Sequence, residues 1–483
     1  MRNIMFRGIN RALRSQGGLR GRIWYSIKAG QPLYETRPHL IRKGELTPGI
    51  SAEEYYVRRM NVLQTIPEKS MVVVPGNETQ FATGSVFHEF RQDPNFYYLT
   101  GFLEPGAALV LYKEDQENVH SIFFVPQTDK NAELWEGERS GTKGAMEVFN
   151  ADAAYPFELI GTYMHELINR CDHVYADMSE NGSRFPRYFK SQGTDILNGS
   201  FADALRRSSG GKTFKSAVSL IEQFRVNKSE EEIDAMRQAS EISASAYNKA
   251  YGERFASEKA LHAYLDYEFK LGGCEMPAYL PVVAGGKHAL TIHYTRNDDL
   301  LRDGDLVLVD AGGRYGGYCA DISRTWPVNG KFTAPQRDLY QALLNVQKQC
   351  IEYCTVDHNM SFDDLHRTSE DLLYTEMLNA GISNLTRGRV RDIYPHYIGH
   401  HLGIDVHDIK TSSRFDKFQS GQVITIEPGV YVPDNDMWPK HFRNIGIRIE
   451  DNIVVGKNSY ENLTIDCAKE IDEIEALAQK KEL

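Results

Sequence analysis

Residues 306–325 read LVLVDAGGRYGGYCADISRT, and this stretch decides the fold of the half of the chain that contains it. An apolar run from Leu306 ends in Asp310, two glycine pairs follow, and the residues from Tyr318 to Thr325 have strand-like composition. Short apolar runs separated by glycines are typical of a β-hairpin. Asp310 ends the first predicted strand and Asp321 enters the second, so the hairpin is expected to bring the two carboxylates side by side.

Two buried carboxylates that lie so close together need a neutralising partner. Like charges repel at short range, so one acid takes up a proton unless a cation lies between the pair. The alternative is a pair of solvated turn acids, and residues 306–325 alone do not separate the two interpretations. The choice depends on residues further along the chain.

The composition is that of an ordinary globular protein. The chain has 483 residues, 41% hydrophobic and 25% charged, which suffices for two or three domains of ~150 residues each. No apolar run approaches the ~18 residues that a membrane-spanning helix needs. The six cysteines are scattered without a C-x-x-C pair, which favours a reducing compartment over a disulfide framework or a zinc cage. The net charge of −11 argues against a nucleic-acid-binding surface.

The start of the chain has a different charge pattern. The first 34 residues contain seven basic residues and no acid. A helical wheel separates three arginines from four apolar residues: Arg7, Arg11 and Arg14 against Met5, Ile9, Ala12 and Leu13. This pattern predicts a mitochondrial presequence over residues 1–34, cut between Arg22 and Tyr34, whose removal leaves the rest folded. A disordered basic tail or a nucleic-acid arm is the alternative, but neither needs such a segregation of apolar residues.

The remaining chain divides into two predicted domains. Ser51 and Glu54 form a capping-box pattern at the start of a helix, and apolar strand-like runs follow at residues 71–75, 107–112 and 121–125. This mixture predicts an α/β domain over residues 45–225. A second capping-box pattern, Ser229 with Glu232, opens a helix at the start of a domain over residues 229–483.

The second domain concentrates histidines and acids. His396, His400, His401 and His407 lie in PHYIGHHLGIDVHD, and Glu427 and Glu450 each end a run rich in β-branched residues. Together with Asp310 and Asp321 they match the ligand types of a divalent-metal hydrolase, and two divalent cations would balance the four carboxylates. For His401 and His441 we favour the simpler interpretation of an ordinary polar side chain without a role in the site.

The order of these residues resembles the dinuclear metallopeptidases of the pita-bread fold, which include methionine aminopeptidases, prolidases and aminopeptidase P. The second aspartate follows the first by eleven residues, and Glu450 follows Glu427 by twenty-three. His293 lies seventeen residues before Asp310, and His407 lies seven after His400. These spacings fit aminopeptidase P and prolidase.

The resemblance covers nearly the whole chain after the predicted leader. Residues 90–112, FRQDPNFYYLTGFLEPGAALVLY, are similar to the amino-terminal domain of aminopeptidase P. Residues 30–50 and 466–475 resemble the mitochondrial branch of that family, the intermediate-cleaving aminopeptidases. The fold class implied is α/β (α+β), with an amino-terminal α/β domain followed by a pita-bread catalytic domain.

Family roles can be carried over to matching positions. The resemblance implies two divalent metal ions per chain, with manganese expected, held by Asp310, Asp321, His400, Glu427 and Glu450. It implies a hydroxide between the metals that attacks the first peptide carbonyl, while Glu427 also moves a proton to the leaving nitrogen. The residues that match catalytic or substrate-binding positions are His293, His396, His407, Tyr431 and Arg448. Trp135 is a candidate to reach the site of a neighbouring subunit, and a homo-oligomer is left open.

The expected function is a mitochondrial metalloaminopeptidase, in the matrix or at the inner membrane, that removes a single amino-terminal residue. That residue is a bulky Tyr, Leu or Phe exposed by presequence cleavage, or the residue before a proline. A prolidase acting on X-Pro dipeptides would use much the same side chains and remains an alternative. A methionine aminopeptidase would not need the amino-terminal domain, and a non-enzymatic pita-bread binding module would be expected to have lost metal ligands.

Overall fold

The computed structural model describes residues 28–177 and 212–479. The chain divides into two compact units, of which the first ends at Phe224 and the second begins at Arg225. Most of the predicted leader, residues 1–27, lies outside the described residues. Within the described residues, no helix combines the length and the apolar character that a membrane span requires.

The amino-terminal unit is built on a five-stranded sheet with the strand order β8-β7-β6-β3-β9. The three central strands are antiparallel neighbours, whereas β8 and β9 pair in parallel at the two edges. The elements of this unit are β1 (Glu45–Thr47), β2 (Ile50–Ser51), α2 (Ala52–Thr65), β3 (Ser70–Pro75), β4 (Phe81–Thr83), β5 (Val86–Phe87), α3 (Pro94–Thr100), β6 (Ala108–Lys113), β7 (Val119–Val125), α4 (Lys130–Glu136), α5 (Gly141–Glu147), β8 (Ala153–Pro156), η1 (Phe157–Leu159), α6 (Ile160–Arg170) and β9 (His173–Tyr175), with α8 (Ala217–Arg225) leading into the second unit.

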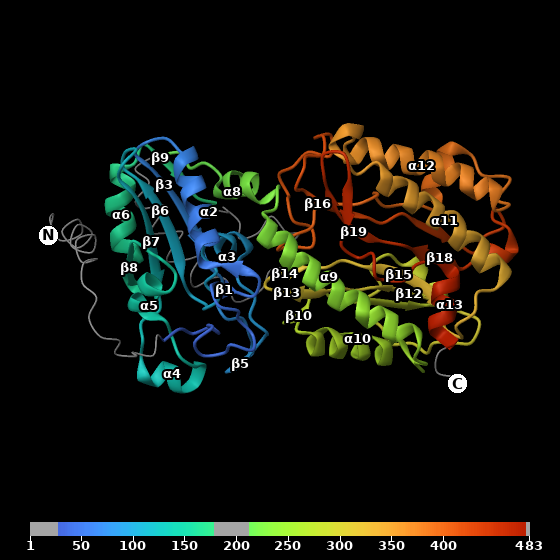
Figure 1. Ribbon diagram of the computed structural model, residues 1–483, viewed down its shortest axis with the longest axis horizontal. Coiled ribbons are helices and arrows are strands. Elements are labelled where there is room, and N and C mark those ends of the chain that lie inside the picture. Colours follow the sequence, from blue (N-terminus) through green and yellow to red (C-terminus); the bar gives the residue numbers. More distant parts are fainter. Residues whose placement is uncertain (1–27, 178–211, 480–483) are drawn as a thin grey trace. The chain divides into compact units, whose positions relative to one another are not determined.

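The core of this unit forms where the sheet meets α6. Met71 and Val110 from the central strands pack in one cluster with Met164 and Ile168 of α6, and all four side chains are fully buried. Figure 1 shows α6 beside one face of the sheet and α2 beside the other. The three predicted strands of this unit are present as β3, β6 and β7, and Ser51 caps α2 as expected by accepting a hydrogen bond from the amide of Glu54.

The segment before β1 belongs to this unit. The amide of Gly30 donates to Oε1 of Glu104 at 3.0 Å, and Nε2 of Gln31 donates to the carbonyl of Gly101 at 3.0 Å. The amide of Leu103 donates back to Oε1 of Gln31 at 2.8 Å, and the Leu33 side chain is only 5% exposed. Residues 30–33, which lie within the predicted leader, therefore make contacts inside this unit.

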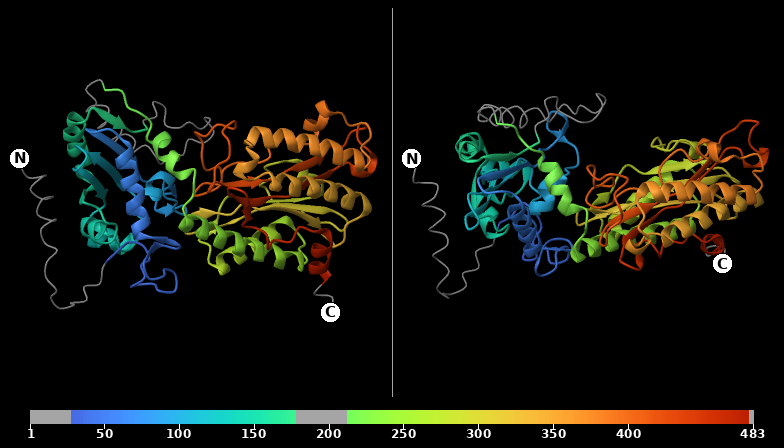
Figure 2. Two further views of the ribbon diagram at one scale, coloured as in Figure 1. Left: turned by 45° about the horizontal axis from the view of Figure 1, so that its top comes forward. Right: turned by 90° about the horizontal axis from the view of Figure 1, so that it is seen from above.

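The second unit consists of short antiparallel sheets between two pairs of helices. Figures 1 and 2 show α9 and α10 on one side of the strands and α11 and α12 on the other. The elements are α9 (Glu230–Tyr251), α10 (Glu258–Gly272), β10 (Met276–Pro277), β11 (Val282–Gly285), η3 (Gly286–Leu290), β12 (Leu306–Asp310), β13 (Gly313–Tyr315), β14 (Tyr318–Cys319), β15 (Ser323–Pro327), α11 (Ala334–Glu352), η4 (Val356–His358), α12 (Phe362–Asn379), η5 (Arg387–Asp392), β16 (Val423–Ile426), β17 (Gly429–Val432), η6 (Lys440–Phe442), β18 (Ile445–Arg448), β19 (Asp451–Val455), β20 (Tyr460–Asn462) and α13 (Ile471–Gln479).

The helices form because their sequences supply both a cap and an apolar face. Ser229 accepts from the amide of Glu232, and the Glu232 carboxylate accepts from the amide of Ser229, which completes the predicted capping box of α9. Met236 and Tyr247 of α9 are fully buried, and Tyr247 packs in the main core with strand residues such as Val309 and Ile447.

The predicted hairpin of residues 306–325 is present in two parts. Strand β12 pairs with β15, with Asp310 opposite Ser323, while the short strands β13 and β14 pair beyond them in a separate sheet with β10. A Cβ at Gly312 would lie 2.0 Å from the carbonyl oxygen of Ala320, so the close approach of the two chains admits only glycine. Asp321 lies in the segment between β14 and β15, so it is not opposite Asp310 in the strand register.

Candidate metal centre and active site

Strand ends bring the five predicted ligand residues together. Asp310 is the last residue of β12, Glu427 follows β16 directly, and Glu450 lies two residues after β18. His400 is held beside β16, because its carbonyl accepts from the amide of Thr425 at 2.9 Å and its amide donates to Oγ1 of Thr425 at 3.1 Å. Carboxylates at strand ends can face a common point while the apolar residues before them fill the core.

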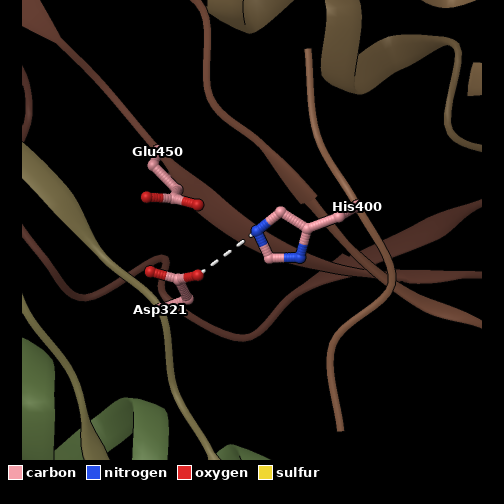
Figure 3. A group of neighbouring side chains, drawn as sticks. All are labelled: Asp321, His400 and Glu450. Atoms are coloured by element: carbon pink, nitrogen blue, oxygen red, sulfur yellow. Dashed lines mark ion pairs between the residues drawn. The ribbon is translucent and has the colours of Figure 1, made fainter. Parts of the chain in front are cut away.

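His400 lies at the centre of the acidic cluster. Its Nε2 atom is 3.4 Å from Oδ2 of Asp321 and 3.5 Å from Oε1 of Glu427. One ligand atom from each of Asp321, His400 and Glu450 lies within 4.8 Å of the others, and Figure 3 shows both carboxylates facing the imidazole ring. The sequence-predicted ligands Asp321, His400, Glu427 and Glu450 are thus neighbours in the fold.

Tyr279 connects Asp310 to this cluster. Its hydroxyl oxygen lies 2.5 Å from Oδ1 of Asp310 and 2.6 Å from Oδ1 of Asp321. A hydroxyl has one proton and can donate to one carboxylate at a time, so the second short contact requires a proton on an acid or a cation nearby. The hairpin therefore brings Asp310 and Asp321 within reach of one oxygen atom, as expected from the sequence.

Arg448 holds the outer side of Asp310. Its Nη2 donates to Oδ2 of Asp310 at 2.7 Å, and its Nε donates to Oγ of Ser323 at 2.8 Å. The Ser323 hydroxyl in turn donates to Oε2 of Glu450 at 2.8 Å. Ser323, which is opposite Asp310 in the register of β12 and β15, thus relays between Arg448 and Glu450.

Burial and crowding raise the pKa values of three of the four acids, whereas for Asp321 the effect of burial is outweighed by the hydrogen bond and charge attraction of His400, which lower its pKa. Burial raises the pKa of Glu427 to about 7, although the positive charge of His400 opposes the shift. Burial raises the pKa of Glu450 well above its usual range, and the negative charge of Asp321 adds to the effect. Burial also raises the pKa of Asp310, against the opposing charge of Arg448. Without added positive charge, the cluster therefore holds protons on carboxylates at neutral pH.

His400 shows the same need for positive charge. Burial alone would lower the pKa of its imidazole, but the hydrogen bond with Asp321 and the charge of Glu427 outweigh burial and raise the pKa to about 9. Its Nδ1 lies 3.0 Å from the carbonyl oxygen of His401, and because a carbonyl only accepts, Nδ1 carries a proton. This bond directs Nε2 toward the carboxylates, which is the arrangement of a histidine that binds a metal ion.

The cluster fits a divalent cation. Oε1 of Glu450 is buried and has no hydrogen-bond partner among the described residues, which is costly for a carboxylate oxygen unless a cation approaches it. A ligand set of carboxylate oxygens and one imidazole nitrogen suits Mn²⁺ or Zn²⁺, whereas softer metal ions prefer thiolate ligands. All six cysteines are buried free thiols, and none belongs to the cluster.

A hydrogen-bond chain runs from Arg448 to the predicted substrate residue His396. Nη1 of Arg448 donates to the Tyr431 hydroxyl at 2.7 Å, and that hydroxyl lies 2.9 Å from Nε2 of His396. Nδ1 of His396 lies 2.9 Å from the carbonyl oxygen of Tyr397, so Nδ1 donates there and Nε2 accepts from Tyr431. Burial, together with the charge of Arg448, lowers the pKa of His396 to about 3, so the ring is neutral at pH 7.

The other predicted site residues lie at different distances from the cluster. The ring of His407 meets that of His400 edge to face with centroids 4.3 Å apart, and burial lowers the pKa of His407 to about 4. His293 lies after η3 with an exposed side chain, near enough for its charge to help lower the pKa values of His396 and His407. Trp135 lies on α4 of the amino-terminal unit and is 86% exposed.

Two histidines for which the sequence suggested no role have ordinary surroundings. His401 is buried with its ring edge to face against Phe362, and burial lowers the pKa of the ring to about 3. His441 is exposed and its ring lies against that of the next residue, Phe442. Neither belongs to the group of ligand atoms around His400.

Besides Thr425, sequence reasoning missed other residues that contact the predicted ligands. Tyr279 reaches both aspartates, Ser323 reaches Glu450, and Asn452 holds the main chain of Asp321. Tyr279 and Asn452 lie 42 and 131 residues from Asp321, and neither forms part of a spaced motif. Ser323 alone had a signal, because it follows Asp321 on the predicted hairpin.

The cluster of buried acids around one imidazole fits a metal-dependent hydrolase. Comparison with known proteins shows the class to be the metal-dependent aminopeptidases. Residues 234–457 match metallopeptidase family M24, and residues 55–175 match the amino-terminal domain of aminopeptidase P. The chain belongs to metallopeptidase family M24, in the group that contains intermediate cleaving peptidase 55 and aminopeptidase P.

Individual relatives match over almost their full length. Intermediate cleaving peptidase 55 of Saccharomyces cerevisiae is 48% identical over 461 residues, which cover 95% of this chain and 90% of the relative. Xaa-Pro aminopeptidase 3 of Homo sapiens is 35% identical over 471 residues, covering 93% and 90%. The crystal structure of Saccharomyces cerevisiae Icp55 without its amino-terminal 58 residues matches with a TM-score of 0.82 and 44% identity, covering 90% of this chain and 99% of that one. These findings confirm the family and the fold class expected from the sequence.

Proposed function

We propose that this aminopeptidase removes one residue from protein amino termini newly exposed by presequence cleavage, at a centre formed by Asp310, Asp321, His400, Glu427 and Glu450. The observation that supports the chemistry best is the convergence of these side chains around His400, with the buried Oε1 of Glu450 lacking a partner among the described residues. The substrate class follows the name of the yeast relative, intermediate cleaving peptidase 55.

We infer that the centre holds two divalent ions and that manganese is the metal used. When ionised, the four carboxylates bring four negative charges, which two divalent cations balance and one does not. Bound ions of this kind lower the pKa of water and polarise a peptide carbonyl. The raised pKa values of Glu450 and Asp310 support this inference, because they show how unfavourable the negative charges are without a counterion.

Glu427 is the residue that we assign to proton transfer. Its Oε1 lies 3.5 Å from Nε2 of His400, inside the cluster where the attacking water would be held, and a carboxylate within reach of that water can serve as a general base. From this position the carboxylate accepts the proton of the attacking water and delivers it to the leaving nitrogen.

The neutral histidines suit binding of the substrate peptide. His396 and His407 have lowered pKa values, so at pH 7 both rings are neutral and do not repel the positively charged substrate amine, and the single N–H of His407 can donate to a peptide carbonyl. Tyr431 and Arg448 keep His396 in one tautomer through the chain described above. We place the exposed side chain of His293 at the entrance to the same site, where it contacts the substrate.

The cellular setting is also part of the proposal. The basic, acid-free start of the chain supports location in mitochondria, in the matrix or at the inner membrane. We propose two functional domains, residues 45–225 and 229–483, after the leader. The large exposed ring of Trp135 is suited to an interface, so we assign it to contact with a neighbouring subunit of a homo-oligomer.

A panel of peptides with different amino-terminal residues tests the substrate assignment. We expect the metal-stripped enzyme, reloaded with Mn²⁺, to remove one residue from peptides that begin Tyr-Ser, Leu-Ser or Phe-Ser. The same peptides with acetylated amino termini are the matched control and should remain intact. Cleavage confined to X-Pro peptides would instead favour the activity in the name of the human relative, Xaa-Pro aminopeptidase 3, and cleavage confined to X-Pro dipeptides would favour a prolidase.

A further inference from the structure

Asn452 is a fully buried side chain at the start of β19, two residues after Glu450. In an extended segment, residues two apart face the same side, so Glu450 and Asn452 point toward the candidate metal centre while Asp451 points away from it. Asp451 accordingly pairs with Arg324 at 2.7 Å and accepts from Gln347 at 2.8 Å on the other side.

The carboxamide of Asn452 binds the main chain of Asp321 at both polar groups. Its Oδ1 accepts from the amide of Asp321 at 3.0 Å, and its Nδ2 donates to the carbonyl of Asp321 at 2.5 Å. This pairing reproduces what a neighbouring strand would provide, at a residue that lies in the segment between β14 and β15 and not in a strand. The Asp321 backbone is therefore fixed by a side chain from a distant part of the sequence.

The same contact couples two ligand residues. Asp321 and Glu450 lie 129 residues apart in the sequence, yet Asn452 ties the main chain of the first to the strand that carries the second. Oδ2 of Asp321 faces Nε2 of His400 at 3.4 Å, so a shift of the Asp321 main chain would change the spacing of the ligand atoms. Two mutually repelling carboxylates need such support, because repulsion would otherwise drive them apart before a cation binds.

We propose that Asn452 is a positioning residue for the metal centre: its carboxamide holds Asp321 at a fixed distance from Glu450, so that the two carboxylates are arranged for a divalent cation in advance. The inference rests on the proposed metal centre and adds to it a residue that itself binds no metal. Outer residues that orient metal ligands typically contribute about 10–100-fold in metal affinity.

The test compares two asparagines of the same sheet, the buried Asn452 on β19 and the half-buried Asn462 on β20. Asn452→Ala removes both hydrogen bonds to Asp321. Asn462→Ala on β20 removes the bond to Oδ2 of Asp451 at 3.1 Å and the two bonds that Oδ1 accepts from Thr464, without touching a ligand residue. Mn²⁺ binding to each metal-stripped protein is measured by calorimetry, and the thermal midpoint of each metal-free protein by circular dichroism. Asn452→Asp serves as the second variant if the alanine variant does not fold, because it keeps the shape but replaces the Nδ2 donor with an oxygen that repels the Asp321 carbonyl.

We expect Asn452→Ala to weaken Mn²⁺ binding by about 10–100-fold. The Mn²⁺ affinity of Asn462→Ala should stay within about twofold of that of the unmodified protein. At saturating Mn²⁺ the Asn452 variant should recover most of its kcat, and KM for the peptide should stay unchanged, because the residue does not contact substrate. Mn²⁺ affinity within twofold of the unmodified protein in folded Asn452 variants overturns the inference, as does an equal loss in the Asn462 variant. If the unmodified protein itself binds no Mn²⁺, the proposed metal centre fails and not merely the role of Asn452.

Discussion

Nε2 of His400 lies 3.4 Å from Oδ2 of Asp321, and the hydrogen bond between them contributes to raising the histidine pKa to about 9. In the metal-free protein a proton on the imidazole thus occupies the position where a cation is expected. Metal binding has to displace that proton, since a histidine binds a metal through a neutral nitrogen. Proton and metal therefore compete for the same group of side chains.

The metal-free protein should become less stable as the pH rises, because the buried Glu427 carboxyl loses its proton. Its folded pKa of about 7 lies above the unfolded value near 4.5, so the folded state binds more protons between these limits and the free energy of unfolding falls across them. Glu427→Gln removes this titration. At pH 8 we expect the free energy of unfolding of the metal-free variant to be on the order of 2 kcal/mol higher than that of the metal-free unmodified protein. At pH 5 the difference should be much smaller.

Urea unfolding of both metal-free proteins at pH 5 and pH 8 measures this difference. His400 acts in the same direction at higher pH, because stability from its raised pKa is complete below about pH 6.5 and is lost as the pH rises through about 9. A stability difference that does not grow with pH would show that Glu427 is not held in the unfavourable surroundings described here.

Loss of either central carboxylate should abolish activity. Asp321→Asn and Glu450→Gln each keep the size of the side chain but remove a negative charge that a metal ion requires. We expect kcat/KM to fall by at least about 10³-fold and bound Mn²⁺ to fall below the unmodified level. The metal-free Glu450→Gln variant should be no less stable than the metal-free unmodified protein, because like-charge repulsion is relieved, whereas metal-free Asp321→Asn loses the favourable contact with protonated His400. Activity within a few-fold of the unmodified enzyme would contradict the ligand assignment.

Site residues that belong to a local sequence pattern could be predicted, whereas contacts between distant segments could not. Glu427 and Glu450 could be predicted because β-branched runs mark strands, and a carboxylate at the end of such a run is conspicuous. Ser229 and Glu232 were predictable because a capping box is a local pattern. The contacts of Tyr279 and Asn452 could not be predicted, because they join residues far apart in sequence and depend on how separate sheets pack.

For a related reason, the sequence alone does not show which residues near the predicted end of the leader are docked on the folded unit. Basic composition identifies the start of the chain, but the hydrogen bonds of Gln31 to Gly101 and Leu103 are visible only in the fold. Charge pattern reports the absence of acids and gives no information on which residues are docked. The acid-free run extends to Tyr34, whereas the folded unit already includes Gly30.

Two truncations should therefore behave differently. A chain that begins at Gly30 should keep the thermal midpoint of the full chain, because Lys28 is exposed and its 3.6 Å ion pair with Glu138 lies at the surface. A chain that begins at Glu35 loses the buried Leu33, worth about 1.5–3 kcal/mol, and the hydrogen bonds of Gln31, worth about 1 kcal/mol each. Its midpoint should fall by several degrees. Gln31→Ala in the longer chain should account for part of the loss, and equal midpoints for both truncations would contradict the docking of this segment.

Cells without the enzyme should accumulate mitochondrial proteins with one extra amino-terminal residue. Presequence cleavage leaves Tyr, Leu or Phe at the new end in the proposed pathway, and removal of that residue is the assigned reaction. Mass spectrometry of mitochondrial amino termini, with and without the gene, measures the difference directly. Re-expression of the active enzyme should reverse it and re-expression of Glu450→Gln should not. Unchanged amino termini would reject this substrate class while leaving the metal chemistry intact.

The central claim is that Asp310, Asp321, His400, Glu427 and Glu450 hold the metal ions that this aminopeptidase uses. The most direct measurement is the Mn²⁺ content per folded chain during titration of the metal-stripped enzyme, with hydrolysis of a Tyr-Ser peptide followed in the same samples. We predict two ions per chain at saturation, activity that rises with occupancy, and loss of both in Glu450→Gln. Activity that persists in the metal-stripped protein, or metal content unaffected by Glu450→Gln, would contradict the account.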